Sequence, residues 1–129
     1  MSSRPPPLEP FTVLDRIGTG ITVFPVAALL FFHALAGRAF AQMFRDFGAL
    51  GALPPLTALS ISWWFPAVLG LAPLGALVRG VLAGTPVPER RTWIVGAFLM
   101  ACVGLAVCTA GVYLPIFDLA GKIKADDAP

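Results

Sequence analysis

Three long apolar segments that contain no Asp, Glu, Lys or Arg constrain the fold of this chain more than any other feature. They cover residues 17–37, 47–78 and 92–117. An α-helix rises about 1.5 Å per residue, so roughly 20 residues cross the hydrocarbon core of a bilayer. Each segment is long enough, and the sequence therefore predicts an all-α integral membrane protein with three transmembrane helices.

The composition fits a membrane protein and excludes several functional classes. Of the 129 residues, 57% are hydrophobic and 12% are charged, whereas a soluble domain carries about 25% charged residues. The spans leave no room for a soluble catalytic domain. A net charge of +2 without a basic run argues against nucleic acid as a partner. We expect membrane lipid and other membrane subunits, or a second copy of the chain, as partners, and no small-molecule substrate is evident.

A single domain is expected. It is a three-helix transmembrane domain over residues 20–118, with a proline-rich polar tail at 1–19 and a second polar tail at 119–129. The expected spans are 20–37, 59–78 and 92–113. Tryptophans near the starts of the second and third spans are typical of the membrane interface.

Three local patterns refine this outline. Residues 39–47 place Phe40, Met43 and Phe44 on one face, which predicts an interfacial amphipathic extension of the first span. Thr57 or Ser60 is expected to cap the second span. Pro73 is expected to kink that span, because its missing amide leaves a backbone carbonyl unpaired.

Small residues mark a packing face on the third span. They allow close approach of a neighbouring helix, and they are Gly96, Ala97, Ala101, Gly104, Cys108 and Gly111. Replacement of Gly104 or Ala101 by Leu is expected to weaken helix association. Cys102 and Cys108 lie on opposite faces of one helix, so no disulfide is expected between them.

No group of residues predicts catalysis. His33 is the only histidine, and without a second ligand a metal site would need another chain. A packing role for His33 is the leading interpretation, and a proton or metal role stays open. No nucleophile has a base beside it in the pattern, and no Asp or Glu lies in a predicted span. We therefore expect no enzyme activity and no cofactor.

The distribution of basic residues predicts how the chain is oriented in the membrane. The amino-terminal tail and the second loop carry five basic residues, and the first loop and the carboxyl-terminal tail carry four. The positive-inside rule then favours a cytoplasmic amino terminus. The expected location is a bacterial-type inner membrane, with the carboxyl terminus outside.

The order of short motifs resembles the membrane part of the F-family inner-membrane platform protein of type II secretion and type IV pilus systems. Phe24-Pro25 opens the first span, and the Phe- and Met-containing residues 39–44 continue it. Gly48 then precedes Leu53-Pro54-Pro55-Leu56-Thr57, and the third span closes with Leu114-Pro115-Ile116-Phe117. The resemblance implies contacts with membrane subunits of a secretion or pilus-type assembly at Leu53, Pro54, Thr57, Pro115 and Phe117. The loop at 80–91 is too short for the family's cytoplasmic domains, so an ATPase partner is not implied. The alternative function is an accessory subunit of a respiratory or transport complex.

Overall fold

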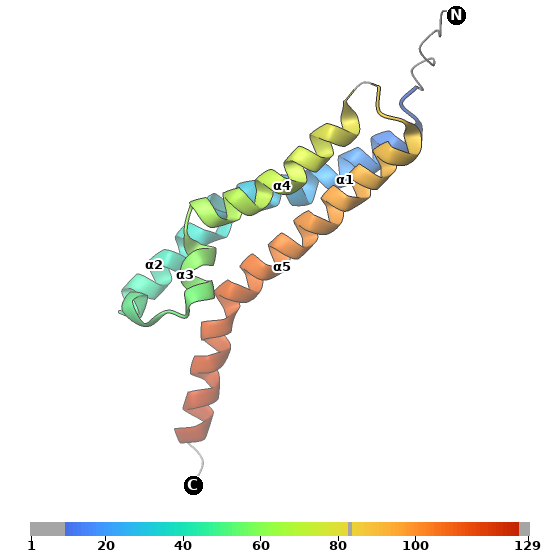
Figure 1. The fold of residues 1–129 in the computed structure, drawn as a ribbon. Coiled ribbons are helices and arrows are strands. Elements are labelled where there is room, and N and C mark those ends of the chain that lie inside the picture. Colours follow the sequence, from blue (N-terminus) through green and yellow to red (C-terminus); the bar gives the residue numbers. More distant parts are fainter. Residues whose placement is uncertain (1–9, 83, 127–129) are drawn as a thin grey trace, which may run out of the picture.

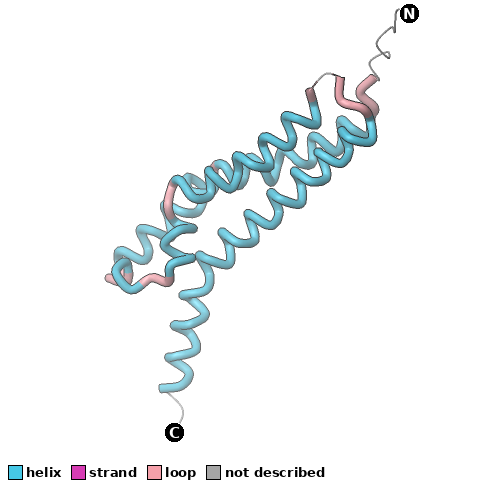
Figure 2. The backbone as a smooth tube through the Cα atoms, in the orientation of Figure 1, coloured by secondary structure: helices cyan, strands magenta, loops and turns pink. Residues whose placement is uncertain are grey.

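A computed structural model describes residues 10–82 and 84–126, and this described part is helical without strands (Figure 2). The elements follow one another as α1 (Val13–Leu30), the π-helix η1 (His33–Gly37), α2 (Arg38–Asp46), the 3-10 turn η2 (Leu50–Ala52), α3 (Pro55–Ile61), α4 (Trp64–Val81) and α5 (Val87–Asp126).

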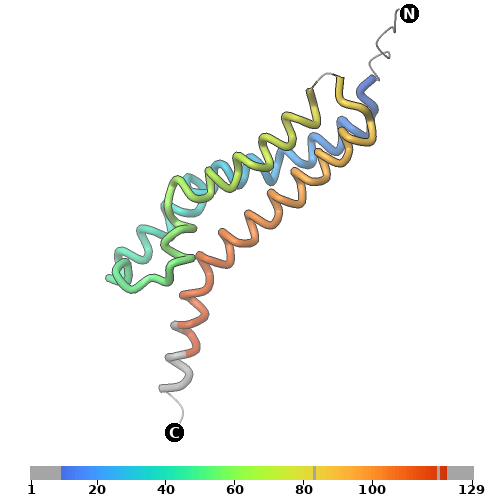
Figure 3. The backbone as a smooth tube through the Cα atoms, in the orientation of Figure 1, coloured from blue at the N-terminus to red at the C-terminus, as the bar shows by residue number. Residues whose placement is uncertain are grey.

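Three helices are long and apolar enough to cross a membrane, which confirms the predicted fold class. They are α1, α4 and residues Val87–Asp118 of α5. All three pack against one another, and α2 and α3 lie at the end of this bundle where α1 finishes (Figure 1). The first turns of α1, in blue, and the red part of α5 lie towards opposite ends of the molecule (Figure 3).

The first span begins earlier than expected. α1 starts at Val13 rather than at residue 20, because Thr12 and Asp15 form a capping box. The Asp15 amide donates to the Thr12 hydroxyl at 3.2 Å, and the Thr12 amide donates to the Asp15 carboxylate at 3.2 Å. These reciprocal bonds satisfy two amides that a helix start leaves unpaired. The end of the expected polar tail is therefore part of α1.

The expected amphipathic extension of the first span is α2, which follows the π-helix directly. The Phe44 side chain is buried, and the Phe40 ring lies edge-on to Tyr113 with 5.6 Å between centroids. The apolar face of α2 thus packs against α5 of the same chain. α2 ends at Asp46, two residues before Gly48, whose φ of +66° suits glycine. The amides of Gly48 and Ala49 donate to the carbonyls of Arg45 and Phe44 and close the end of the helix.

The second apolar segment is broken where a single helix was expected. α3 ends at Ile61, and Ser62 adopts an extended conformation before α4 begins at Trp64. Neither Thr57 nor Ser60 caps a helix, so that expectation was wrong. The Ser62 hydroxyl accepts from the Phe65 amide at 3.3 Å instead. α4 runs through Pro73 to Val81.

The third span is part of a helix of 40 residues. The third span was expected to end at residue 113, but α5 passes through Pro115 and continues to Asp126. Much of the expected polar tail is therefore helical, and residues 127–129 lie outside the described part. The axis of α5 changes direction below the level of α3 (Figure 1), as expected for a helix that contains proline.

Candidate helix-packing site

The small residues of α5 line the interior of the bundle. Buried positions recur at spacings of three and four, and they are Ile94, Ala97, Ala101, Gly104, Cys108 and Gly111. The side chains of Ala97, Ala101 and Cys108 have 0% exposure. Five of the six predicted packing positions thus form one buried stripe, which we call the α5 seam. Cys102 and Cys108 are both free thiols.

Gly96 lies away from this seam. A Cβ atom built at Gly96 meets no other atom within 4 Å, so the position is open. Its neighbours Val95 and Leu99 are also more than half exposed. Gly96 therefore takes no part in packing within the chain.

The α5 seam is filled by the other helices of the same chain. A Cβ at Gly104 would lie 2.7 Å from Leu29 Cδ2 on α1, and one at Gly70 on α4 would lie 2.7 Å from Leu30 Cδ2. Leu29 itself is completely buried. Because these contacts are internal, a partner molecule has to bind elsewhere on the surface.

Thr57, Gly111 and Pro115 come together at one point. The Thr57 hydroxyl donates to the Gly111 carbonyl at 2.6 Å, across 54 positions of sequence. In an α-helix this carbonyl accepts from the amide four residues later, and here that residue is Pro115, which has no amide hydrogen. A threonine side chain therefore satisfies the carbonyl that the proline leaves unpaired, as membrane helices require.

Ser60 lies beside this bond, and the remaining residues of the two motifs differ in their burial. Ser60 Oγ is buried and so close to Gly111 that a Cβ on the glycine would collide with it. Pro54 precedes α3 in an extended conformation, and Leu53 is half-buried. Phe117 lies apart from the group, with 71% of its surface exposed. The structure brings Thr57 and Pro115 together and leaves Phe117 at the surface.

His33 makes a structural contact. Its Nδ1 lies 2.9 Å from the carbonyl oxygen of Ile61. A carbonyl oxygen only accepts, so this hydrogen bond requires the tautomer with a proton on Nδ1. Within residues 10–82 and 84–126, no group of three or more His, Cys, Asp or Glu side chains is placed to hold a metal ion.

A buried ion pair that the sequence did not predict lies at the other end of the bundle. The Arg90 guanidinium donates to the Asp15 carboxylate at 3.1 Å, with side-chain exposures of 5% and 0%. Arg90 also donates to the Thr85 carbonyl at 3.0 Å and lies over the Phe11 ring. The statement that no acidic residue lies in a span was wrong, because Asp15 is part of the first spanning helix. The pattern Thr12-x-x-Asp15 before an apolar run is typical of a capping box, and it could have predicted that the first helix begins here.

Arg91 completes this cluster from the exposed side of α5. Its Nε donates to Asp15 at 3.4 Å, while 49% of its side chain is exposed. The nearby pair of Arg79 and Glu89, at 3.3 Å, is exposed on both sides and contributes little to stability. The cluster thus holds the starts of α1 and α5 together.

We compared the chain with protein-family models, with curated proteins and with solved structures, and none of these comparisons gave a match. The three apolar helices identify a small integral membrane protein.

Proposed function

We propose that this small integral membrane protein is a non-enzymatic, platform-like subunit of a secretion or pilus-type assembly in a bacterial inner membrane. The observation that supports the proposal is the hydrogen bond between Thr57 and the Gly111 carbonyl. It joins the Leu-Pro-Pro-Leu-Thr motif to α5, the helix that contains Leu-Pro-Ile-Phe. Two of the four motifs that carry the family resemblance thus depend on each other physically.

The exposed part of α5 gives the proposed partner surface. α5 extends beyond the ends of α1 and α4 (Figure 1). On this extension Leu114 and Phe117 are 49% and 71% exposed. Since the α5 seam is filled internally, the proposed subunit contacts are made here, and the amino terminus is proposed to lie in the cytoplasm.

Site-specific crosslinking in native membranes tests this function. A photo-crosslinking residue at Phe117 is compared with one at Leu71, which is 58% exposed in the middle of α4. We expect Phe117 to capture subunits of a secretion or pilus-type assembly and Leu71 to capture lipid. Tagged chain is extracted gently, and crosslinked proteins are identified by mass spectrometry.

The other results would replace the proposal. Capture of redox or transporter subunits would favour an accessory subunit of a respiratory or transport complex. Crosslinks only to further copies of the chain would indicate a homo-oligomer. Equal capture of the same subunits at Leu71 would remove the exposed part of α5 as the contact surface.

A further inference from the structure

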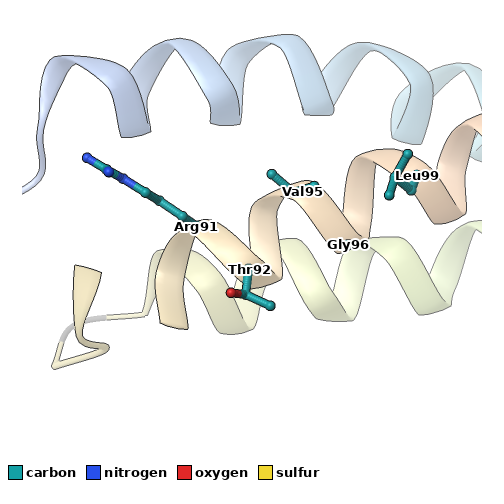
Figure 4. A pocket seen from close by; sticks show the side chains of 5 residues that line it. All are labelled: Arg91, Thr92, Val95, Gly96 and Leu99. Carbon is teal, nitrogen blue, oxygen red and sulfur yellow. The ribbon is translucent and has the colours of Figure 1, made fainter. Parts of the chain in front are cut away.

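Arg91 lies at the meeting point of two apolar grooves on the surface of the bundle. One groove, of about 450 Å³, is shallow and open, and it runs along the surface of α5 past Thr92, Val95, Gly96 and Leu99 (Figure 4). The second, of about 300 Å³, lies between α1 and α5 and is lined mainly by Leu14, Ile17, Ile21 and Ile94. Arg91 and Val95 line both grooves. The Val95 side chain therefore lies between the two grooves, and the Arg91 guanidinium is the charged group that they share.

The guanidinium of Arg91 is only partly used within the chain. Its Nε donates to Asp15, and among residues 10–82 and 84–126 no hydrogen bond engages its two Nη atoms. Arg90 and Arg91 share the single carboxylate of Asp15, so the cluster carries a net positive charge. It also lies in the first turns of α5, where the helix dipole favours an anion.

The position of Arg91 along α5 matches the headgroup region of a bilayer. Trp93, two residues further along, marks the membrane interface. Val95 and Leu99 follow Arg91 by four and eight residues, which places them roughly 6 and 12 Å deeper along the helix. The charged end of each groove therefore lies at the interface, and the apolar part runs towards the hydrocarbon core.

We propose that Arg91 and the two grooves bind one diacyl phospholipid with an anionic headgroup. The Arg91 Nη atoms donate to the lipid phosphate, because guanidinium forms strong, charge-assisted hydrogen bonds with phosphate. One acyl chain lies in each groove, on either side of Val95. Two grooves that share one cation fit a ligand with one anionic head and two apolar chains. This inference is independent of the proposed subunit function.

Gly96 gives a way to fill a groove without disturbing the fold. A Cβ at Gly96 meets no atom of the chain within 4 Å, so Gly96→Leu places its side chain where the acyl chain would lie. The matched control is Gly75→Leu on α4, since a Cβ at Gly75 also meets nothing within 4 Å. Gly75 lines neither groove at Arg91.

The test is a lipid titration of the purified full chain in detergent, followed by native mass spectrometry. Phosphatidylglycerol is compared with phosphatidylcholine that has the same acyl chains. We expect a preference of about tenfold or more for the anionic lipid, which corresponds to about 1.4 kcal/mol. Arg91→Gln should abolish this preference and Arg91→Lys should retain most of it. Gly96→Leu should weaken binding of both lipids, and Gly75→Leu should bind as the wild type does.

Two further ligands separate a lipid site from a general anion site. Lysophosphatidylglycerol, which has one acyl chain, should bind more weakly than the diacyl lipid, and inorganic phosphate should not compete with it. Equal binding of the anionic and zwitterionic lipids would overturn the proposal, as would an unchanged preference in Arg91→Gln. Displacement by phosphate alone would also overturn it. If Gly96→Leu proves unfolded by circular dichroism, the lysolipid comparison decides whether the grooves hold two chains.

Discussion

The Thr57 hydroxyl donates a hydrogen bond of 2.6 Å to the backbone carbonyl of Gly111, inside the apolar bundle. Pro115 follows Gly111 by one turn and cannot donate to that carbonyl. An unpaired carbonyl in a membrane interior costs free energy, so α5 needs a donor from another helix at this point. α3 supplies it, which explains how α5 continues through Pro115.

Thr57→Val should lower the free energy of unfolding by about 1 kcal/mol, because the Gly111 carbonyl loses its donor while the side-chain volume is kept. Thermal or denaturant unfolding in detergent micelles measures this change. In a Pro115→Ala background the amide of residue 115 can donate to Gly111, and the cost of Thr57→Val should become much smaller. Equal costs in the two backgrounds would contradict this role of Thr57.

The α5 seam makes a separate prediction about close packing. Gly104→Ala should lower the free energy of unfolding by about 1–3 kcal/mol, because its Cβ forces Leu29 to move from a fully buried position. Gly96→Ala is the matched control on the same helix, where a Cβ meets open space. The free energy of unfolding of each variant is obtained from the ratio of unfolded to folded chain in detergent micelles. A smaller cost at Gly104 than at Gly96 would show that the seam is not tightly packed.

The buried pair of Asp15 and Arg90 predicts that the stability of the fold depends strongly on the Asp15 carboxylate. Asp15→Asn should lower the Tm in micelles far more than Glu89→Gln, which breaks the exposed pair with Arg79. The reason is that Arg90 stays charged and buried without its counter-charge, and removal of one partner of a buried pair is strongly destabilising.

A second substitution checks this explanation of the Asp15 variant. Arg90→Gln, added to Asp15→Asn, should restore part of the lost stability, because the buried charge is then gone. Additive losses from the two substitutions would indicate that Asp15 and Arg90 are not coupled.

The sequence predicted the three spans and most of the α5 seam, because these follow from apolar length and from a three-four spacing of small residues. The break at Ser62 was missed, since residues on both sides are equally apolar and hydropathy does not change there. The end expected for the third span at residue 113 was wrong, because the donor that compensates for Pro115 lies 58 residues earlier in the chain.

The Asp15 cluster was missed for a similar reason. Asp15 and Arg90 are 75 residues apart, and each alone resembles a charge in a solvated tail or loop. Only the antiparallel course of α1 and α4, followed by the turn into α5, brings the two together. Local patterns therefore indicated the elements, whereas the contacts between distant polar groups required the structure.

His33 serves the same purpose as Thr57 at a second defect in the helices. The Ile61 carbonyl would accept from the Phe65 amide in a continuous helix, but that amide donates to the Ser62 hydroxyl. His33 donates to Ile61 instead, at 2.9 Å. His33→Leu should therefore lower the free energy of unfolding by about 1 kcal/mol, measured by unfolding in micelles. His33→Gln, which keeps a side-chain donor, should lose less. If the purified protein shows a haem-like absorbance that His33→Leu removes without any loss of stability, the accessory-subunit alternative would be favoured instead.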